Sequence, residues 1–229
     1  MTDVLVKKIK NDIIEGVLKP GERLLPLREL ALKYEVSRSV INGVISSLSA
    51  LGYVSVTDRH FVVVNDFMSQ GSTDVLLDVL ESGNRRLQLR TLKDSLRYRK
   101  LIMLESIRMI IQNPHADLKG LIDAIEKQKA WMAAPDNDID LIMKLDLAFF
   151  HGIIDAGDNV VIKLIHRNFN EMSSRMIRFY YRSYNLAHQH FKTYGEIVKA
   201  ILDHDEKKAV AIMEQVMDLG ATYVLRLMN

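Results

Sequence analysis

The stretch VSRSVINGVISSLSALGYVSV (residues 36–56) combines a helix-length apolar pattern, a glycine and a strand-like run. Ser37 is a good N-cap residue, and an apolar stripe at helical spacing follows it. Gly52 is typical of the position just past the end of a helix. The stretch therefore predicts a capped helix that stops before a β-strand at residues 53–56.

The residues on both sides of this stretch predict three helices followed by a β-hairpin. Apolar residues at helical spacing predict one helix at residues 4–18 and a short second helix at residues 27–34. Two β-rich runs, residues 53–56 and 61–64, predict the hairpin. Three helices and a hairpin are the plan of a winged helix-turn-helix, which indicates a DNA-binding domain at residues 1–67.

The rest of the chain predicts a linker and a helical bundle. Residues 68–84 contain serine, glycine and one apolar patch, which indicate a linker with a short helix, and residues 85–229 form a helical effector domain. The expected fold class is mainly α, with an N-terminal winged helix-turn-helix and a C-terminal all-α bundle of about seven helices. The bundle helices are expected at residues 73–81, 87–112, 117–132, 138–156, 160–184, 188–204 and 206–228.

The composition limits the classes of function. The chain has 229 residues, of which 48% are hydrophobic and 26% charged, and its net charge is +2. A charge this small argues against a general polyanion-binding surface, so any nucleic-acid contact has to come from a local patch. The absence of cysteine excludes disulfides, thiolate catalysis and Cys-based zinc sites. No apolar run is long enough to cross a bilayer and the N-terminus does not resemble a signal peptide, which indicates a cytoplasmic protein without a membrane partner.

The leading end of the helix in the quoted stretch carries groups that bind DNA. Hydroxyls and N–H groups at a helix start bind phosphate, and an arginine bonds guanine O6 and N7 together. Ser37, Arg38 and Ser39 supply this chemistry, and Asn42, one turn beyond Arg38, is placed to read adenine. Two residues at the hairpin tip are expected to enter the neighbouring minor groove: Arg59 and His60. The alternative is that Ser37 only caps the helix and Arg38 is only a solvated charge.

A family resemblance supports the DNA-binding interpretation. The segment GVLKPGERLLPLRELALKYEVSRSVINGVISSLSALGYVSV (residues 16–56) resembles the N-terminal domain of the GntR family of bacterial transcription regulators. The resemblance covers about forty continuous residues. It implies operator contacts by Arg28, by Arg38 and by the neighbours of Arg38. Departures from the usual residues of the recognition helix predict a non-standard operator.

The helical half resembles the ligand-binding domain of the FadR branch of that family. The resemblance rests on Leu96-Arg97, on LDLAFFHGIIDAGDN (residues 145–159) and on YGEIVKAILDHDEKKAVAIME (residues 194–214). It implies a domain that binds a small-molecule effector and alters the affinity of the chain for DNA.

Many members of this branch bind a divalent metal through one Asp and three His. Asp146 holds the Asp position here, but Phe150, Tyr194 and Val216 stand at the three His positions. His151 does not restore the site, because it lies about 140° around the helix from Asp146. The resemblance therefore implies that the metal site is lost and that no cofactor is bound.

The same substitutions bear on the effector. A pocket with apolar side chains in place of imidazoles suits an apolar ligand, and the fatty-acid-responsive members of the branch bind a long-chain acyl-CoA. The resemblance thus implies an acyl-CoA or fatty-acid-like effector. The alternatives are a small organic acid, a metal-dependent effector or no small-molecule effector. The candidate effector-binding residues are Arg97, Leu101, Asp146, Phe150, Arg175, Tyr194 and Val216.

Basic residues form a further pattern, at residues 85–100 and again around Arg175. The functional interpretation is that these basic residues bind the phosphates of a nucleotide, as in coenzyme A. The alternative interpretation is a solvated helix face or an interdomain contact. Arg97 stands at a family arginine position that faces the pocket, so the resemblance makes it the leading ligand contact.

The expected mechanism is allosteric. An effector that prefers one arrangement of the domains shifts the population toward or away from DNA binding. Two recognition helices on one palindromic operator require a homodimer with matched half-sites. The sequence contains no Glu-x-x-His pair, no Gly-rich phosphate loop and no nucleophile elbow, so an enzyme is not expected.

Overall fold

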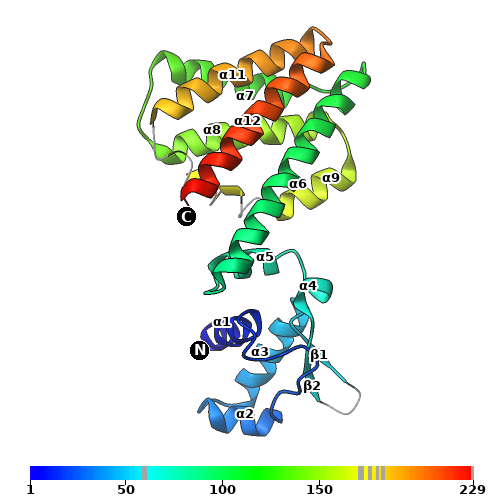
Figure 1. The fold of residues 1–229 in the computed structure, drawn as a ribbon, viewed down its shortest axis with the longest axis vertical. Coiled ribbons are helices and arrows are strands. Elements are labelled where there is room, and N and C mark those ends of the chain that lie inside the picture. The colour runs from blue at the N-terminus through cyan, green and yellow to red at the C-terminus, as the bar shows by residue number, and fades with distance from the viewer. Residues whose placement is uncertain (58–60, 170–172, 175–176, 179–180, 182–183, 228–229) are drawn as a thin grey trace. The chain divides into compact units, whose positions relative to one another are not determined.

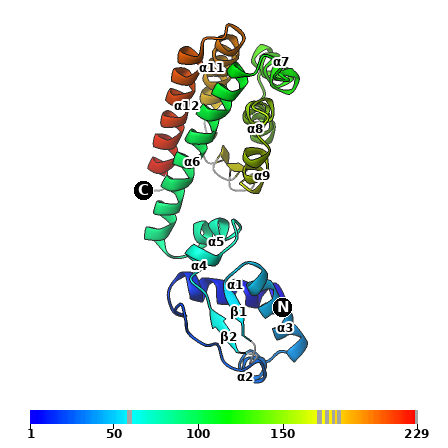
Figure 2. The same cartoon turned by 90° about the vertical axis from the view of Figure 1, so that its right-hand side faces the viewer.

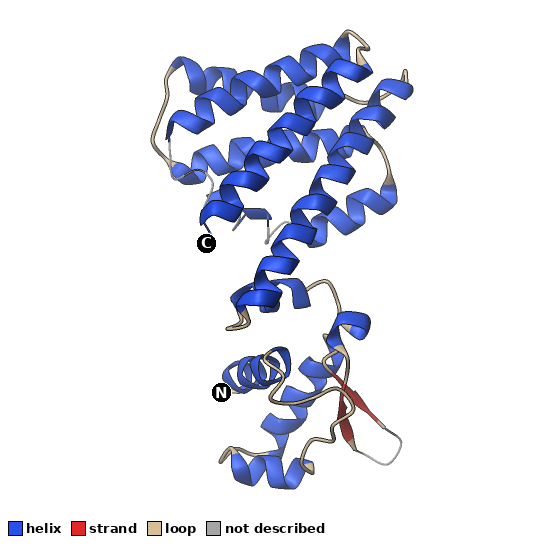
Figure 3. Cartoon of the chain, viewed as in Figure 1, coloured by secondary structure: helices blue, strands red, loops and turns tan. Residues whose placement is uncertain are grey.

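The computed structural model describes residues 1–57, 61–169, 173–174, 177–178, 181 and 184–227. Across these residues the chain is mainly helical, and its strands form one antiparallel pair (Figure 3), which confirms the predicted fold class. The chain divides into two compact units, Met1–Thr91 and Leu92–Asn229, called unit 1 and unit 2 below. Within the described ranges, every helix is too short or too polar to serve as a membrane span.

Unit 1 begins with three helices and a hairpin, as the sequence predicts (Figure 1). The hairpin strands pair with Val54 opposite Val64 and Val56 opposite Val62. Its elements are α1 (Thr2–Ile14), α2 (Leu27–Lys33), α3 (Arg38–Ala50), β1 (Val54–Val56), β2 (Val62–Val64), α4 (Phe67–Gln70) and α5 (Val75–Glu81).

Local sequence explains where α3 begins and ends. The Ser37 Oγ accepts a hydrogen bond of 3.3 Å from the Val40 N–H, which satisfies one of the free donors at the helix start. Gly52 follows the helix with a φ of +80°, a left-handed conformation that glycine adopts without strain. Burial of each large apolar side chain on the inner face contributes about 1.5–3 kcal/mol. The buried residues of α3 are Ile41, Val44, Ile45 and Leu48.

The segment after the hairpin packs onto unit 1. Two valines of α5 are buried in the same apolar core as α3. Asp78 of α5 accepts hydrogen bonds from the Tyr53 hydroxyl at 2.9 Å and from the Lys10 Nζ at 2.5 Å. The predicted linker at residues 68–84 is therefore part of a compact unit that runs on to Thr91.

Unit 2 is a bundle of helices, in which α7 packs on α8 and α11 packs on both α7 and α12. Figure 2 shows α6 beside α12, and across these two helices the Lys100 Nζ lies 2.8 Å from Glu214 and 2.9 Å from Asp218. The helix α6 starts in unit 1 and continues into unit 2. The elements are α6 (Arg85–Gln112), α7 (Lys119–Ala133), α8 (Ile139–Ala156), α9 (Val160–Asn168), α11 (Tyr184–Leu202) and α12 (Glu206–Leu227).

One predicted helix is wrong in its extent. The periodicity predicts a single helix at residues 160–184, but α9 ends at Asn168, and Tyr181 lies in a turn before α11 begins. No glycine or proline marks this break in the sequence, and the apolar spacing continues across it because Ile177 and Tyr181 are buried. Apolar periodicity indicates which residues are buried but not whether the helix is continuous, and here the buried residues lie on both sides of a break in the helix.

Candidate functional site

The first candidate site is the N-terminal end of α3. Ser37, Arg38 and Ser39 are all exposed, and Asn42 is exposed one turn further along the helix. Because the apolar stripe of α3 is buried, these polar side chains lie on the outer surface of unit 1. Arg28 of α2 is exposed as well.

Arg38 points away from the core of unit 1 and into solvent. Arg38 is exposed and forms no ion pair with any described residue. Its guanidinium is thus available to an external acceptor, and the helix start beside it adds a partial positive charge. The two predicted contacts at the hairpin tip, Arg59 and His60, lie outside the described residues.

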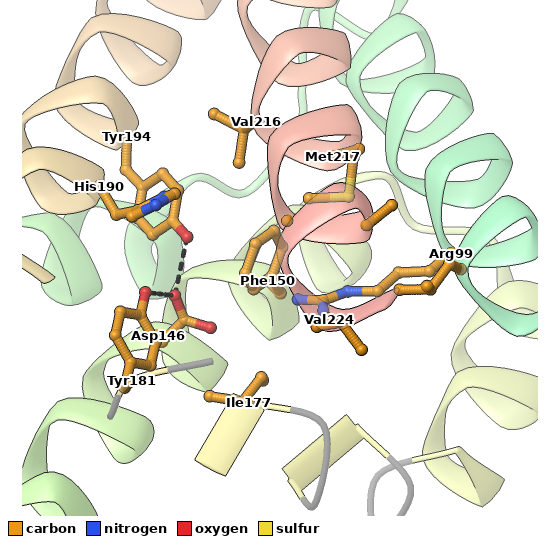
Figure 4. Close-up of a pocket in the computed structure, with 13 residues that line it drawn as sticks. Arg99, Asp146, Phe150, Ile177, Tyr181, His190, Tyr194, Val216, Met217 and Val224 are labelled. Atoms are coloured by element: carbon orange, nitrogen blue, oxygen red, sulfur yellow. Dashed lines mark hydrogen bonds between the residues drawn. The ribbon is translucent and has the colours of Figure 1, made fainter. Parts of the chain in front are cut away.

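The second candidate site is a small cavity inside unit 2, drawn in Figure 4, with a volume of about 40 Å³. Its walls come from α6, α8, α11, α12 and the segment that precedes α11. Most of the wall is apolar, and α12 contributes only carbon and sulfur side chains and a glycine. The polar side chains that line it are Arg99, Asp146, Tyr181, His190 and Tyr194.

Asp146 is the central polar group of this cavity. Its side chain is buried, and its Oδ1 accepts hydrogen bonds from the Tyr194 hydroxyl at 2.7 Å and from the Tyr181 hydroxyl. No described residue donates a hydrogen bond to Oδ2. Burial raises the pKa of Asp146, while the nearby Arg99 charge and the two hydroxyls oppose that rise. Burial and the Asp146 carboxylate in turn raise the pKa of both tyrosines.

Arg99 enters the cavity from α6. Its guanidinium lies over the Phe150 ring, 4.2 Å from the ring centroid, in a cation–π contact. Figure 4 shows the side chain reaching in from α6 beside Phe150. The Nε atom is buried and has no hydrogen-bond partner among the described residues. An unpaired buried N–H costs about 1–3 kcal/mol, so this donor favours any ligand that brings an acceptor.

His190 completes the polar wall as a neutral group. Burial lowers the pKa of His190 to about 4, so its imidazole carries no charge near neutral pH. Its ring lies 5.9 Å from that of Tyr194 and 6.2 Å from that of Tyr181, measured between centroids. The charged groups of the described wall are therefore Arg99 and, when it is ionised, Asp146.

The structure brings four of the predicted effector contacts together: Asp146, Phe150, Tyr194 and Val216 all line the cavity. Two others do not line it. Arg97 is exposed, and Leu101 is 61% exposed. On α6 the residue two positions after Arg97 points about 200° away from it, so Arg99 takes the place predicted for Arg97. Arg175 lies outside the described residues.

Sequence reasoning missed three polar residues of the cavity. Arg99 stands in a run of basic residues in which the sequence alone does not single out one member. His190 lies one helical turn before Tyr194, a spacing that places both on one face of α11. Tyr181 precedes α11 in a segment whose periodicity suggested a continuous helix, so no signal in the sequence places it beside Asp146.

The donors of this cavity do not fit a divalent metal. Phe150 and Val216 line the cavity with hydrocarbon side chains, and Tyr194 uses its hydroxyl as a donor to Asp146. Metal ligands need a free electron pair directed at the ion, which carbon side chains lack. Within the described residues, no three His, Asp or Glu side chains are grouped so that they could hold a metal ion.

Replacing Asp146 by asparagine tests the buried carboxyl. The amide oxygen can accept both tyrosine hydrogen bonds but never ionises. Burial raises the pKa of Asp146 in the folded state above 3.8, the value of a free carboxyl. The protonated carboxyl therefore contributes stability that is fully present below pH 3.8, and this contribution is lost as the pH rises through the folded-state pKa. Asp146→Asn should therefore gain stability relative to wild type as pH rises from 4 to 8. Thermal melts of both proteins across this pH range measure the difference in melting temperature between variant and wild type. A difference that stays constant with pH would contradict the prediction.

Comparison with known proteins identifies a protein family for each half of the chain. Residues 2–64 match the profile of the bacterial regulatory proteins of the gntR family, and residues 94–219 match the FCD domain. The chain is 28% identical over 170 residues to the HTH-type transcriptional regulator LutR of Bacillus subtilis (strain 168), covering 72% of this chain and 70% of LutR. It is 26% identical over 212 residues to the Glc operon transcriptional activator of Escherichia coli (strain K12), covering 87% and 80% of the two chains.

Solved structures show the same fold at low sequence identity. The Lar protein, which controls expression of the Listeria monocytogenes agr system, superposes with a TM-score of 0.60 at 18% identity, over 99% of this chain and 97% of that one. Escherichia coli McbR/YncC superposes with a TM-score of 0.51 at 17% identity, over 100% and 99% of the two chains. With both domain profiles matched in this order along the chain, the protein belongs to the gntR family of bacterial regulatory proteins and carries an FCD domain behind its helix-turn-helix domain.

Proposed function

We propose that this chain is a ligand-responsive transcription regulator that reads a double-stranded DNA operator with the N-terminal end of α3. The observation that carries the proposal is the exposed guanidinium of Arg38 beside the capped helix start at Ser37. An arginine at this place bonds guanine through two N–H groups, and hydroxyls next to it bind phosphate. Asn42 then faces the next base pairs, and Arg28 supplies a backbone contact.

The effector in this proposal is a small organic molecule with one carboxylate and one hydrogen-bond donor. The Arg99 Nε–H lacks an acceptor among the described residues, and the Asp146 Oδ2 receives no donor from them. A carboxylate bonded to Arg99 and a hydroxyl or amine bonded to Asp146 would satisfy both groups at once. Charge-assisted hydrogen bonds of this kind are about twice as strong as neutral ones, so these two groups would orient the ligand.

The cavity volume favours this class of ligand over an acyl-CoA. The cavity measures about 40 Å³, whereas pockets that bury drug-sized ligands measure roughly 300–1,000 Å³. A long acyl chain with a nucleotide would need the bundle to open far beyond the described arrangement. A molecule of a few non-hydrogen atoms needs only small side-chain movements.

Control of DNA binding follows from linkage between the two sites. A ligand that binds one arrangement of the chain more tightly shifts the population toward it by the difference in affinity. Two copies of the chain on a palindromic operator double the recognition surface and fix the spacing of the half-sites. We therefore place the functional form as a homodimer on DNA in the cytoplasm.

The variant Arg38→Ala tests the operator contact. Loss of a guanine contact by arginine costs about 1–3 kcal/mol, which is roughly a 5- to 150-fold loss of affinity. The duplex for this measurement is selected from a random pool by the full-length wild-type protein. Fluorescence anisotropy at fixed salt then gives the dissociation constants of wild type and variant for this duplex and for a scrambled one.

The matched control is Arg108→Ala, which removes a half-buried arginine of α6 that pairs with Glu105 of α6 and Glu206 of α12 in unit 2. It should bind the selected duplex as tightly as wild type does. The docking of α3 is wrong if Arg38→Ala keeps wild-type affinity for the selected duplex. A weaker affinity that falls equally for selected and scrambled DNA would show a phosphate contact in place of base recognition.

A further inference from the structure

We propose that two copies of this chain associate through the outward face of α9, which packs in antiparallel orientation against the same helix of the partner subunit. The inference rests on the proposed function, which takes the functional form to be a homodimer. It goes further by naming the surface that joins the two copies and the orientation in which they meet. The observations that carry it are the exposed side chains along α9 and the charges at its two ends.

Four aliphatic side chains lie exposed on one face of α9, and they are called the α9 patch below. The exposed fractions are 66% for Val160, 63% for Val161, 59% for Leu164 and 38% for Ile165. At 100° per residue the four side chains span about 140° of the helix surface, and the opposite face carries the buried His166. Figures 1 and 2 both show α9 at the edge of the bundle, so this face is open to a partner.

The described residues of unit 2 offer no comparable surface elsewhere. Each of the other helices exposes one large apolar side chain among those described, except α8, which exposes Ile139 and Leu141. These two are two positions apart, so they point in directions about 200° apart. Single exposed apolar residues are ordinary on a soluble protein, whereas a contiguous apolar patch marks a contact surface.

The spacing of the α9 patch favours a second copy of the chain as its partner. The four residues stand at positions i, i+1, i+4 and i+5, a pattern that reads the same from both ends of the helix. Its centre lies between positions 162 and 163. In an antiparallel pair that crosses at this point, Val160 lies level with Ile165 of the partner subunit, and Val161 lies level with Leu164 of the partner subunit. Each patch thus covers the other, which is the self-complementarity that a two-fold interface requires.

The charges at the two ends of the patch favour the same orientation. Asp158 precedes α9, and its Oδ1 lies 2.7 Å from the Lys163 Nζ. Arg167 is exposed one turn beyond Lys163, on the same edge of the helix. Because Asp158 and Arg167 are equally far from the centre of the patch, the antiparallel pair brings Arg167 level with Asp158 of the partner subunit at both ends. A parallel pair would place like charges together, so the charges select the antiparallel arrangement.

The α9 patch forms the centre of the proposed interface, and polar residues complete it. A stable interface buries roughly 800 Å² on each partner, with an apolar centre inside a polar rim. Asp158 and Arg167 are the first residues of that rim. We therefore expect the two copies to associate in solution in the absence of DNA.

The test measures the dimer dissociation constant of the full-length protein without DNA, by sedimentation velocity over a concentration series. Leu164→Glu places a charge in the apolar centre on both sides of the interface and should weaken the dimer by about 100-fold or more. The matched control is Leu219→Glu, which changes a leucine of α12 that is 62% exposed. The control should dimerise as wild type does, and circular dichroism checks that both variants fold.

Charge reversal tests the antiparallel orientation. Arg167→Asp and Asp158→Arg should each weaken the dimer of that variant by about 5- to 30-fold, because both end pairs become repulsive. An equimolar mixture of the two variants should form a mixed dimer with wild-type affinity, because both end pairs then have opposite charges again. A fluorophore on one of the two variants lets sedimentation report the mixed dimer separately.

Three outcomes would overturn the inference. A Leu164→Glu protein that dimerises as tightly as wild type refutes the surface, and a mixture that dimerises no better than either charge variant alone refutes the orientation. A wild-type chain that is monomeric at every concentration refutes self-association, and its binding to anionic phospholipid vesicles would assign the patch to a lipid surface instead.

Operator binding by the same wild-type sample separates this failure from failure of the proposed function. A chain that binds its selected duplex but shows one of the three outcomes refutes the α9 interface alone. A chain that binds no DNA refutes the proposed function itself.

Discussion

Replacement of Gly52 by alanine should destabilise unit 1 by about 3 kcal/mol or more. Gly52 has a φ of +80°, and a left-handed conformation costs a residue with a Cβ about 1–2 kcal/mol. The added Cβ would also lie 2.2 Å from the Gln70 carbonyl oxygen and 2.8 Å from the Gly71 Cα. Both are backbone atoms, so relief requires the segment after the hairpin to move. Urea unfolding followed by circular dichroism measures the loss.

Gly16→Ala is the matched control for this prediction. Gly16 has a φ of +77°, but a Cβ there would meet no atom within 4 Å. The control isolates the conformational cost, which is about 1–2 kcal/mol, from the cost of overlap. Equal losses in the two variants would mean that the contact between Gly52 and the Gln70 backbone does not constrain the fold.

Gly152→Ala should destabilise unit 2 by about 1–3 kcal/mol. This glycine lies where α8 packs on α7, and its Cβ would lie 2.9 Å from the Leu121 Cα and 3.2 Å from the Leu121 N. The two helices would have to separate, which disturbs the packing around Phe149 that supports the cavity. Thermal melting of unit 2, read from the tyrosine and tryptophan signal, measures the effect.

Gly195→Ala is the control, and it should change the free energy of unfolding in the opposite direction. Gly195 lies inside α11, and a Cβ there would meet no atom within 4 Å. Alanine has the higher helix propensity by about 0.8–1 kcal/mol, so this variant should be slightly more stable than wild type. A stabilised Gly152→Ala protein would show that α7 and α8 are not in close contact at this point.

Most of the fold could be predicted from the sequence, because each helix and strand is specified by residues close together in the chain. A cap at Ser37, an apolar stripe and a glycine at position 52 specify α3, and two valine-rich runs specify the hairpin. The helices of unit 2 follow from periodicity in the same way. The break after Asn168 was not predictable, because the buried residues Ile177 and Tyr181 continue the apolar pattern beyond it.

The cavity was only half predictable, for a geometric reason. Asp146, Phe150 and Tyr194 were placed by position in a family pattern, and the structure brings them to one cavity. Which arginine of α6 joins them depends on the rotation of that helix about its own axis. An error of two positions turns a side chain from the interior to the surface, as it does between Arg97 and Arg99.

Because Asp78 anchors α5 to the core of unit 1, the smallest DNA-binding module that can be moved to another protein has to include α5. A fragment cut after the wing would lose the acceptor for the Tyr53 hydroxyl and the Lys10 ammonium, and would leave the core of α3 open to water. A chimera that joins this DNA-binding module to another ligand-binding domain therefore has to retain α5. The natural joint for such a chimera lies inside α6, where one compact unit gives way to the other.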